Sequence, residues 1–310
     1  MRAVSPSSHI SVEIDLAKIA ANAQVVSQQC RVPILAVIKA DAYGLGIREV
    51  AAALRDHVEG FCVFSLREAQ QADLWNLTGK RAISLSPSGE SPEAFLAAHV
   101  QPAVSSLEQA IRLRTANPVL CVDLGMQRFA CPLDQAEAVL EAGAIREIYC
   151  HATTVEQAFQ LRERFGGRGL KLHAAGSSLL HEPSTYLDAV RPGIALYRDC
   201  ARVSTTLVEV RRSGTPAGYS RFTVDHHGVI LAGYSNGLCR SVCLINGTQR
   251  RILETGMQSA YVECGPADRV GDTVLLLGEG LSAATVGQAA GLSEHEALLR
   301  LCTSGLRTYR

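Results

Sequence analysis

The chain has 310 residues, enough for one large domain and a smaller one with a sizeable core. Basic and acidic residues both number 30, so the formal net charge is zero, which argues against a nucleic acid or a membrane surface as partner. No apolar run approaches membrane-spanning length, and residues 1–8 lack the apolar core of a signal peptide. Ten cysteines are scattered without a CxxC pair, so we expect buried thiols in a reducing cytoplasm and no metal site.

The first predicted element is a helix that begins at Leu16, where apolar residues recur at helical spacing and Asp15 is a suitable N-cap. A short apolar strand over residues 34–38 then leads into Lys39 and a polar turn that contains Tyr43 and two glycines. An ammonium at the end of a buried strand is poorly solvated, and this favours the neutral amine that Schiff-base chemistry needs. Lys39 is therefore the first candidate catalytic residue.

Short apolar strands alternate with helical stretches from this point to about residue 200. The predicted strands cover residues 34–38, 60–65, 82–85, 101–104, 119–122, 148–151, 170–173 and 193–197. The helical patterns between them include residues 106–114, 134–142 and 155–165. Roughly eight strands, each followed by a helix, favour an α/β fold of the (β/α)8 TIM-barrel type. An open doubly wound sheet is the alternative, and the absence of a GxGxxG turn weakens it.

Beyond about residue 200 the pattern changes to strands without long helices between them. These strands are predicted at residues 207–210, 229–234, 241–245, 250–254, 260–263 and 273–277. Asn246-Gly247 is typical of a hairpin turn, and residues 293–296 form a capping box that opens a last short helix. We therefore expect a barrel over residues 10–200 and a C-terminal mainly-β domain over residues 201–310, with residues 1–9 packing on the latter.

Residues 36–46, Ala-Val-Ile-Lys-Ala-Asp-Ala-Tyr-Gly-Leu-Gly, resemble the pyridoxal-phosphate lysine segment of the alanine racemase family. The order of a barrel followed by a β domain is that of the same family, and further matching segments extend the resemblance over nearly the whole chain. The resemblance implies that Lys39 binds the cofactor pyridoxal 5'-phosphate covalently and that Tyr43 reaches its phosphate.

Residues 191–197, Arg-Pro-Gly-Ile-Ala-Leu-Tyr, resemble the family's strand whose arginine faces the pyridine nitrogen of the cofactor. This implies that Arg191 keeps that nitrogen unprotonated, because an arginine does not give up its proton. The resemblance also implies that the backbone amides of Gly193 and Ile194 bind the cofactor phosphate.

Two further matches add cofactor contacts on neighbouring strands. Residues 173–178 resemble the family's histidine-to-serine phosphate loop, which places Ser177 at the phosphate, with Gly176 where the family usually has asparagine. His151 matches the histidine that packs on the cofactor ring and hydrogen-bonds toward Arg191.

Residues 123–129, Asp-Leu-Gly-Met-Gln-Arg-Phe, resemble the family's Asp-Thr-Gly-Met-Gly-Arg segment. Arg128 is thereby implied to contact the phenolic oxygen of the cofactor and the carboxylate of the substrate. Many members of the family carry a modified lysine that orients this arginine, whereas this chain has Cys121 at that position.

Residues 214–220 resemble the segment that presents the second catalytic base, and the match makes Tyr219 that base. In the family this tyrosine reaches the barrel of the opposite subunit, which implies a homodimer with two shared active sites. Tyr234 and Met257 match residues near the substrate, and Glu254 stands where the family usually has an arginine.

The resemblance as a whole implies a cytoplasmic pyridoxal-phosphate-dependent isomerase that interconverts L- and D-alanine with Lys39 and Tyr219 as its two bases. Racemisation of serine or another amino acid is a second hypothesis, and a carboxylate at Glu254 would suit a cationic side chain. A non-catalytic pyridoxal-phosphate-binding protein is a third, but the second domain with its tyrosine argues against it. A barrel-type decarboxylase needs a Cys-Asp segment that residues 264–268 resemble only faintly.

Overall fold

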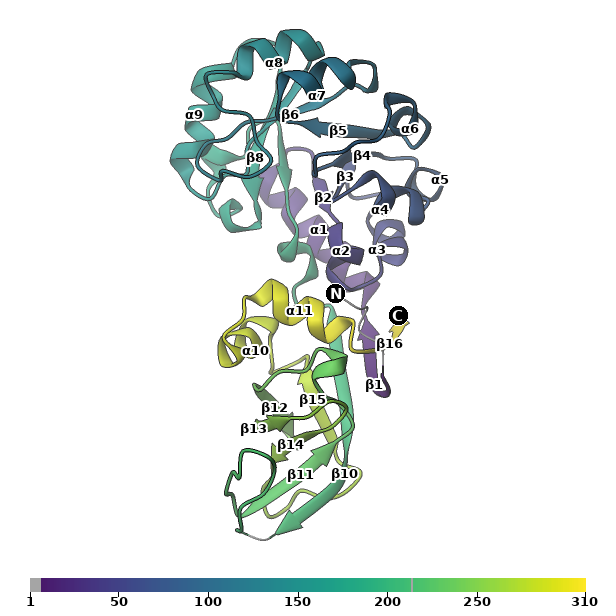
Figure 1. Cartoon of the computed structure of the whole chain (residues 1–310), viewed down its shortest axis with the longest axis vertical. Coiled ribbons are helices and arrows are strands. Elements are labelled where there is room, and N and C mark those ends of the chain that lie inside the picture. The colour runs from purple at the N-terminus through teal and green to yellow at the C-terminus, as the bar shows by residue number, and fades with distance from the viewer. Residues whose placement is uncertain (1–6, 213) are drawn as a thin grey trace. The chain divides into compact units, whose positions relative to one another are not determined.

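The computed structural model describes residues 7–212 and 214–310. Residues 1–6, which belong to the segment expected to pack on the second domain, lie outside the described residues. The chain divides into two compact units (Figure 1). Among the described residues, the barrel unit contains residues 19–42 and 46–197, and the second unit contains residues 7–18, 43–45, 198–212 and 214–310.

Within the described ranges, the barrel unit holds eight parallel strands that neighbour one another in chain order. They are β2 (Leu35–Val37), β3 (Gly60–Val63), β4 (Arg81–Ser84), β5 (Val100–Val104), β6 (Val119–Cys121), β7 (Glu147–Tyr149), β8 (Lys171–Gly176) and β9 (Ala189–Arg191). A parallel bridge joins Ile34 to Val190, and the Val190 amide donates to Pro33 O at 3.0 Å. The last strand therefore pairs with the first and closes the barrel, which confirms the predicted fold class.

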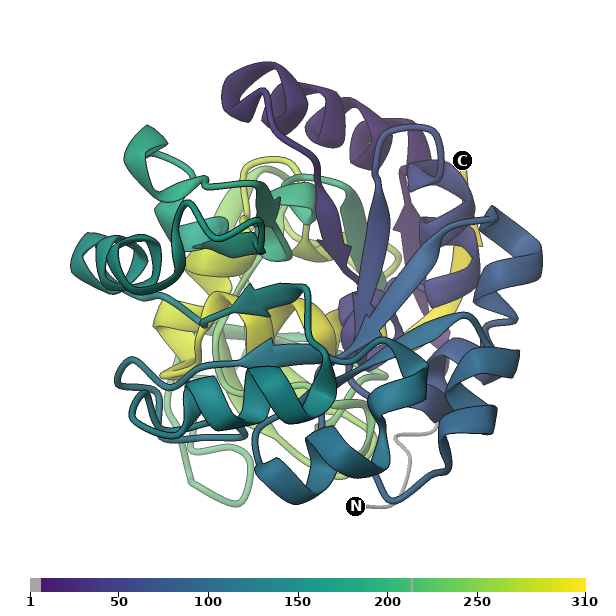
Figure 2. The same ribbon diagram turned by 90° about the horizontal axis from the view of Figure 1, so that it is seen from above.

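Helix α1 precedes the first barrel strand, and further helices follow the strands and surround them (Figure 2). They are α1 (Leu16–Cys30), α2 (Lys39–Tyr43), α3 (Ile47–Leu54), α4 (Leu66–Gln71), α5 (Leu74–Thr78), α6 (Pro92–Ala97), α7 (Leu107–Arg112), α8 (Ala136–Gly143) and α9 (Val155–Phe165). Asp15 caps α1 as predicted, since its Oδ1 accepts from the Lys18 amide at 2.9 Å. Ser65, Ser91 and Ser106 cap α4, α6 and α7 in the same way.

The strand predicted at residues 193–197 is wrong. The last barrel strand lies earlier, at β9, and residues 194–197 form the 3-10 helix η4 (Ile194–Tyr197). Pro192 has no amide to donate to a sheet, and the Leu196 amide bonds back to Gly193 O at 2.9 Å. The apolar run is buried, but burial alone does not distinguish a strand from a helical turn. The other 3-10 helices are η1 (Arg114–Ala116), η2 (Ser177–Leu179), η3 (Pro183–Thr185) and η5 (Tyr234–Asn236).

In the second unit the sheet order is β11-β14-β13-β12-β15-β10-β1-β16, and β10 also pairs with β11. Six of these described strands therefore close on themselves, and β1 and β16 extend the sheet beyond β10. The strands are β1 (Ser7–Ile14), β10 (Ala201–Arg212), β11 (His226–Ile230), β12 (Val242–Ile245), β13 (Thr248–Thr255), β14 (Ala260–Glu263), β15 (Thr273–Leu277) and β16 (Gly305–Tyr309). The predicted β-rich type is confirmed, although β1 and β16 carry no sequence signal that we recognised.

Local signals in the second unit predicted its turn and its last helix. Asn246 and Gly247, with φ of 50° and 74°, connect β12 and β13 as a two-residue hairpin. Ser293 and Glu296 form the expected capping box of α11 (Glu294–Cys302). Helix α10 (Ala283–Ala290), which precedes it, was not predicted.

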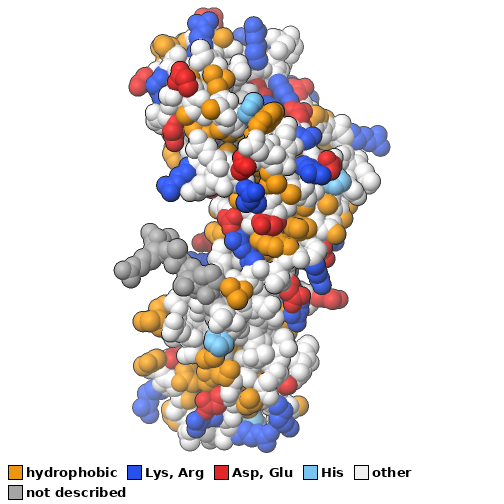
Figure 3. Space-filling model, turned by 90° about the vertical axis from the view of Figure 1, so that its right-hand side faces the viewer, with side chains coloured by type: hydrophobic (Ala, Val, Ile, Leu, Met, Phe, Trp, Pro, Cys, Tyr) orange, Lys and Arg blue, Asp and Glu red, His pale blue; other side chains and the backbone are white. Residues whose placement is uncertain are grey.

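The surface reflects the balanced composition. Basic and acidic side chains are interspersed over the face shown in Figure 3, as the equal totals of 30 and 30 suggest. Among the residues that the structure describes, no helix is long and apolar enough to cross a bilayer.

Candidate active site

Lys39 follows β2 and opens a backbone turn of unusual handedness. The four residues after it, Ala40 to Tyr43, have φ between 52° and 60°, the left-handed region that non-glycine residues rarely occupy. Such residues cost about 1 kcal/mol or more each, so the surroundings must hold them. The Ala42 amide donates to Ile38 O at 2.9 Å, and Asp41 Oδ1 accepts from the Ile47 amide at 2.8 Å. The sequence predicted a polar turn here, but not its handedness.

Glu68 is a residue of this site that the sequence analysis missed. Its Oε1 accepts from the Ala40 amide at 3.1 Å, and its Oε2 accepts from the Phe64 amide at 2.7 Å. The carboxylate thus ties the residue after Lys39 to the end of β3. The capping-box spacing of Ser65 and Glu68 at the start of α4 could have drawn attention to it.

The environment of Lys39 favours its neutral form. Burial lowers the pKa of the amine, and the positive charges of Arg128 and Arg191 lower it further, against a smaller opposing effect of Glu68. Lys39 follows β2, Arg128 follows β6 and Arg191 ends β9, so all three stand at the carboxyl ends of barrel strands.

Arg191, the last residue of β9, is buried with 5% of its surface exposed. Its guanidinium carbon lies 4.4 Å from the ring centroid of Tyr149, and Nη2 donates to Cys150 O. Its Nε is buried and has no hydrogen-bond partner among the described residues. Tyr149 was missed, although strand alternation places Glu147 and Tyr149 on the same, inward face of β7.

Tyr149 also contacts the position that departs from the family pattern. Its hydroxyl is hydrogen-bonded to Cys121, and burial raises the pKa of that thiol. Cys121 is therefore an uncharged neighbour of Tyr149.

His151 follows β7 and is exposed, and the charges of Arg191, Lys39 and Arg128 act on its imidazole. Burial, followed by the charges of Arg191, Lys39 and Arg128, lowers the pKa of His151 to about 4. The imidazole is therefore neutral near pH 7. A neutral ring can accept or donate a hydrogen bond without adding to the positive charge around Lys39.

Arg128 is exposed on the loop that follows β6. Asp123 shapes this loop, because its Oδ1 accepts from the amides of Gly125 and Gln127 at 2.9 and 3.0 Å. These backbone hydrogen bonds lower the pKa of Asp123. The guanidinium carbon of Arg128 lies 5.7 Å from the ring centroid of Phe129.

Ser177, Gly193 and Ile194 are brought together where β8 and β9 end. Ser177 Oγ accepts from the Gly193 amide at 2.9 Å and from the Ala195 amide at 3.2 Å. Ile194 lies between these two donors and opens η4. A hydroxyl and consecutive backbone amides at one place are groups that bind a phosphate.

A buried ion network lies beneath the site, at the amino-terminal ends of the strands. Arg81 donates to Glu147 at 2.6 and 3.1 Å, and His173 Nε2 lies 3.0 Å from Glu147 Oε1. Burial by itself would raise the pKa of Glu147, but the hydrogen bonds from His173 and Arg81 lower it to about 2. Burial lowers the pKa of His173 to about 4, so Arg81 is the charged partner near pH 7.

Three other predicted residues lie in the second unit. Tyr219, Tyr234 and Met257 are 95%, 56% and 63% exposed. The Tyr234 amide donates to Gly256 O at 2.9 Å, next to Met257. Tyr43 belongs to the segment of residues 43–45 that is part of this unit.

Glu254 lies on β13 and does not face outward as an amino-acid side-chain receptor would. Its two carboxylate oxygens accept from the backbone amides of Tyr219 and Ser220, and it is 4% exposed. Glu254 is therefore not available to bind the cationic side chain of a substrate. In the segment that faintly resembled a decarboxylase site, Asp268 accepts from the Gly265 amide at 2.7 Å and pairs with Arg250, which is a structural role.

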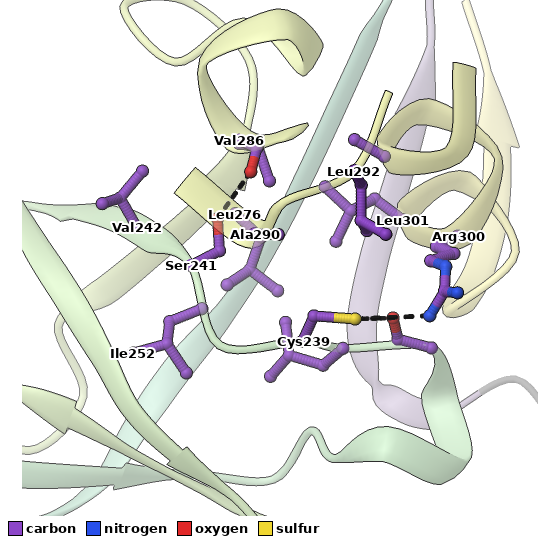
Figure 4. A pocket seen from close by; sticks show the side chains of 13 residues that line it. Cys239, Ser241, Val242, Ile252, Leu276, Val286, Ala290, Leu292, Arg300 and Leu301 are labelled. Atoms are coloured by element: carbon purple, nitrogen blue, oxygen red, sulfur yellow. Dashed lines mark hydrogen bonds between the residues drawn. The ribbon is translucent and has the colours of Figure 1, made fainter. Parts of the chain in front are cut away.

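A small pocket in the second unit contains none of the predicted site residues (Figure 4). Arg300 Nη1 donates to Cys239 Sγ at 3.3 Å beside it, and Ser241 Oγ donates to Val286 O at 2.9 Å. Its cavity volume of about 20 Å³ is close to the space of a single water molecule.

The chain is similar to known proteins over most of its length. Residues 14–200 match the family of the alanine racemase N-terminal domain. The biosynthetic alanine racemase of Escherichia coli K12 is 28% identical in an alignment 322 positions long, which covers 86% of this chain and 89% of that protein. The alanine racemase of Mannheimia succiniciproducens is 26% identical over 353 residues, with coverage of 96% and 98%.

Solved structures agree with this similarity. The biosynthetic alanine racemase from Pseudomonas aeruginosa superposes with a TM-score of 0.87 at 25% identity, over 98% of this chain and 100% of that one. The alanine racemase from Bartonella henselae with covalently bound pyridoxal phosphate has the same fold, with a TM-score of 0.85 at 23% identity and the same coverage. Because the family match covers more than half of the sequence, this chain belongs to the alanine racemase family.

Proposed function

We propose that this protein is a pyridoxal-5'-phosphate-dependent amino-acid racemase that interconverts L- and D-alanine. The observation that carries the proposal is Lys39, an amine at the end of a barrel strand whose pKa is lowered by burial and by Arg128 and Arg191. Membership of the alanine racemase family supports the same reaction.

The residues of the barrel unit fit the cofactor. The buried Nε of Arg191 has no partner among the described residues, so it is a donor available to a bound molecule. Ser177 Oγ and the Gly193 amide lie at hydrogen-bond distance from each other and could both turn to a phosphate. Lys39 would hold the cofactor, and when bound the cofactor would withdraw electrons from the substrate α-carbon and acidify its proton.

Arg191 would restrict the chemistry to proton exchange. A guanidinium keeps its proton, so Arg191 would give none to the bound cofactor and would leave it a weaker electron acceptor. Side reactions that need deeper electron withdrawal are thereby disfavoured. The position of Arg191 over Tyr149 keeps the guanidinium in place.

Lys39 and Tyr219 would act on opposite faces of the α-carbon. One removes the proton at Nζ or Oη and the other returns a proton to the opposite face, so that the configuration inverts. Arg128 would bind the substrate carboxylate, and Tyr234 and Met257 would limit the size of the side chain, which favours alanine.

Tyr219 is the reason to propose a homodimer with two shared sites. Its side chain is 95% exposed in the single chain, which suits a residue that reaches another subunit. For the compartment we propose the cytoplasm, since all ten cysteines are free thiols and nine of them are buried.

A chiral assay tests the proposed function. Purified protein with added pyridoxal 5'-phosphate is given L-alanine, L-serine or L-lysine in turn, and the D-enantiomer is measured. We expect a visible absorption band from the lysine-bound cofactor and turnover that is highest for alanine. Lys39→Ala should remove the band and lower kcat/KM by more than about a thousandfold, whereas Lys80→Ala in the same unit should keep both. A wild-type protein that binds the cofactor but forms no D-amino acid would contradict the proposal.

A further inference from the structure

The loop that carries Tyr219 is held by its backbone while its side chain is left exposed. The Ala217 amide donates to Phe222 O at 2.9 Å, which closes the loop at its base. The ring of Phe222 packs edge-on against Tyr261, with centroids 5.2 Å apart. The base of the loop is therefore anchored on β14.

Glu254 fixes the tip. Its Oε1 accepts from the Tyr219 amide at 2.9 Å, and its Oε2 accepts from the Ser220 amide at 2.6 Å. The hydrogen bond with the Ser220 side chain, together with these two amides and the charge of Arg240, lowers the pKa of Glu254. An ionised carboxylate that accepts from consecutive amides is a strong and directional anchor.

The close approach of the loop to Glu254 depends on a glycine. Gly218 has φ of +69°, and a Cβ there would lie 2.7 Å from Phe222 Cε1 and 2.9 and 3.0 Å from the two carboxylate oxygens of Glu254. Glu254 lies near the end of β13, and Met257 follows that strand next to Gly256, which accepts from the Tyr234 amide. Glu254 thus connects the Tyr219 loop to the end of β13, which Met257 follows in sequence.

We propose that Glu254 is a positioning residue for proton transfer by Tyr219. It acts through the backbone of residues 219 and 220 and does not touch the substrate. The inference rests on the proposed function, in which Tyr219 is the base on one face of the α-carbon. If the anchor is lost, the hydroxyl of Tyr219 moves away from its productive position, and the step on that face slows while the step at Lys39 does not.

The test compares proton exchange from the two enantiomers. Exchange of the α-proton of L- and of D-alanine with deuterium is followed by NMR for the wild type, Tyr219→Phe, Glu254→Gln and Glu254→Ala. We expect both Glu254 variants to slow exchange by about tenfold to a hundredfold from the one enantiomer that Tyr219→Phe slows. Exchange from the other enantiomer should stay within about twofold of the wild type. Glu254→Ala added to Tyr219→Phe should cause no further loss, because the two residues act as one unit.

The control is Glu263→Gln on neighbouring β14, where Glu263 pairs with Arg251 at 2.9 Å and has no role in the site. It should leave both exchange rates unchanged. Equal slowing from both enantiomers by the Glu254 variants, or no slowing at all, would overturn the inference.

A second readout does not need activity. Amide hydrogen exchange of residues 219 and 220 should become about tenfold faster in Glu254→Ala than in the wild type and in Glu263→Gln, because both amides lose their acceptor. If these amides are equally protected in all three proteins, Glu254 is not the anchor. Failure of the wild type to racemise any amino acid would instead refute the proposed function, and the amide measurement would still decide the structural claim.

Discussion

Three residues assigned to proton transfer and substrate binding lie on or beside segments whose backbone amides donate hydrogen bonds to a carboxylate. The pairs are Glu68 with Lys39, Asp123 with Arg128, and Glu254 with Tyr219. A carboxylate has two oxygens that only accept, so it can hold two amides of an irregular segment at once. Functional residues in loops are in this way given fixed positions without a regular hydrogen-bond ladder.

The charge on Arg191 can be tested through Lys39. Arg191→Gln removes one of the cations that lower the pKa of Lys39, so that pKa should rise toward its ordinary value. A higher pKa means that less neutral amine is present at a given pH, and capture of pyridoxal 5'-phosphate by the cofactor-free protein should need a higher pH. Visible absorbance measured against pH gives the shift. Arg55→Gln, at an exposed pair with Asp56, should leave the curve in place.

Glu147 should make the fold sensitive to acid. The pKa of such a carboxyl is lower in the folded chain than in the unfolded chain. Its contribution to the free energy of unfolding is complete at pH values above its ordinary pKa, and it is lost as the pH falls toward the pKa of the folded chain. For Glu147 this loss takes place between about pH 4.5 and about pH 2, and the lost stabilisation is about 3 kcal/mol. The low pKa of buried His173 adds to acid sensitivity, because the unfolded chain binds that proton more readily.

Glu147→Gln should therefore lower the free energy of unfolding by about 3 kcal/mol at pH 7, and its difference from the wild type should shrink below about pH 4. Denaturant unfolding at several pH values measures this. Glu163→Gln, on the exposed face of α9, is the matched control and should change stability by less than about 0.5 kcal/mol. A constant difference at all pH values would show that the lost interaction is not the ionised pair.

At the scale of elements, sequence motifs predicted the structure correctly where a few adjacent residues determine the local conformation. The Asn246-Gly247 turn, the Asp15 cap and the Ser293–Glu296 box all form as expected, because each depends only on neighbours in sequence. The strand predicted at residues 193–197 does not form, because residues 194–197 are buried by the tertiary fold and not by strand pairing. The left-handed turn after Lys39 also has no local signal, since alanine, which occupies two of its positions, rarely adopts this conformation.

The hairpin turn gives a direct test of local conformation. Gly247 has φ of +74°, and a Cβ added there would meet no atom within 4 Å, so Gly247→Ala should cost only backbone strain. We expect a loss of about 1 kcal/mol in the free energy of unfolding, measured by denaturant titration. Gly89→Ala has the same open space without a positive φ and should be neutral or slightly stabilising. Equal effects at the two positions would show that φ is not the cause.

At the scale of the whole molecule, the assigned residues are divided between the two units. Lys39, Arg128, His151 and Arg191 belong to the barrel unit, and Tyr219, Tyr234 and Met257 belong to the second unit. Under the proposed dimer, each active site takes its lysine from one copy and its tyrosine from the partner. Neither copy would then hold a complete site of its own.

Mixing two inactive variants tests this arrangement. Lys39→Ala and Tyr219→Phe subunits, each inactive alone, are unfolded and refolded together. Random pairing gives half mixed dimers, and each mixed dimer has one site with both bases, so activity should return to about a quarter of the wild-type level. Light scattering should show a mass of two chains. If each chain used its own tyrosine, no activity would return on mixing.

The sequence by itself determined the fold class, the family and the identity of the candidate site residues. The periodicity of strands and helices depends on side-chain types that can be read directly from the sequence. The same is true of motifs such as residues 36–46. Only the tertiary structure decided which residues support them: Glu68, Tyr149, Glu147 and Glu254 come from distant parts of the chain or contact backbone atoms. A buried carboxylate is placed by the fold that surrounds it, and its partners cannot be read from its neighbours in sequence.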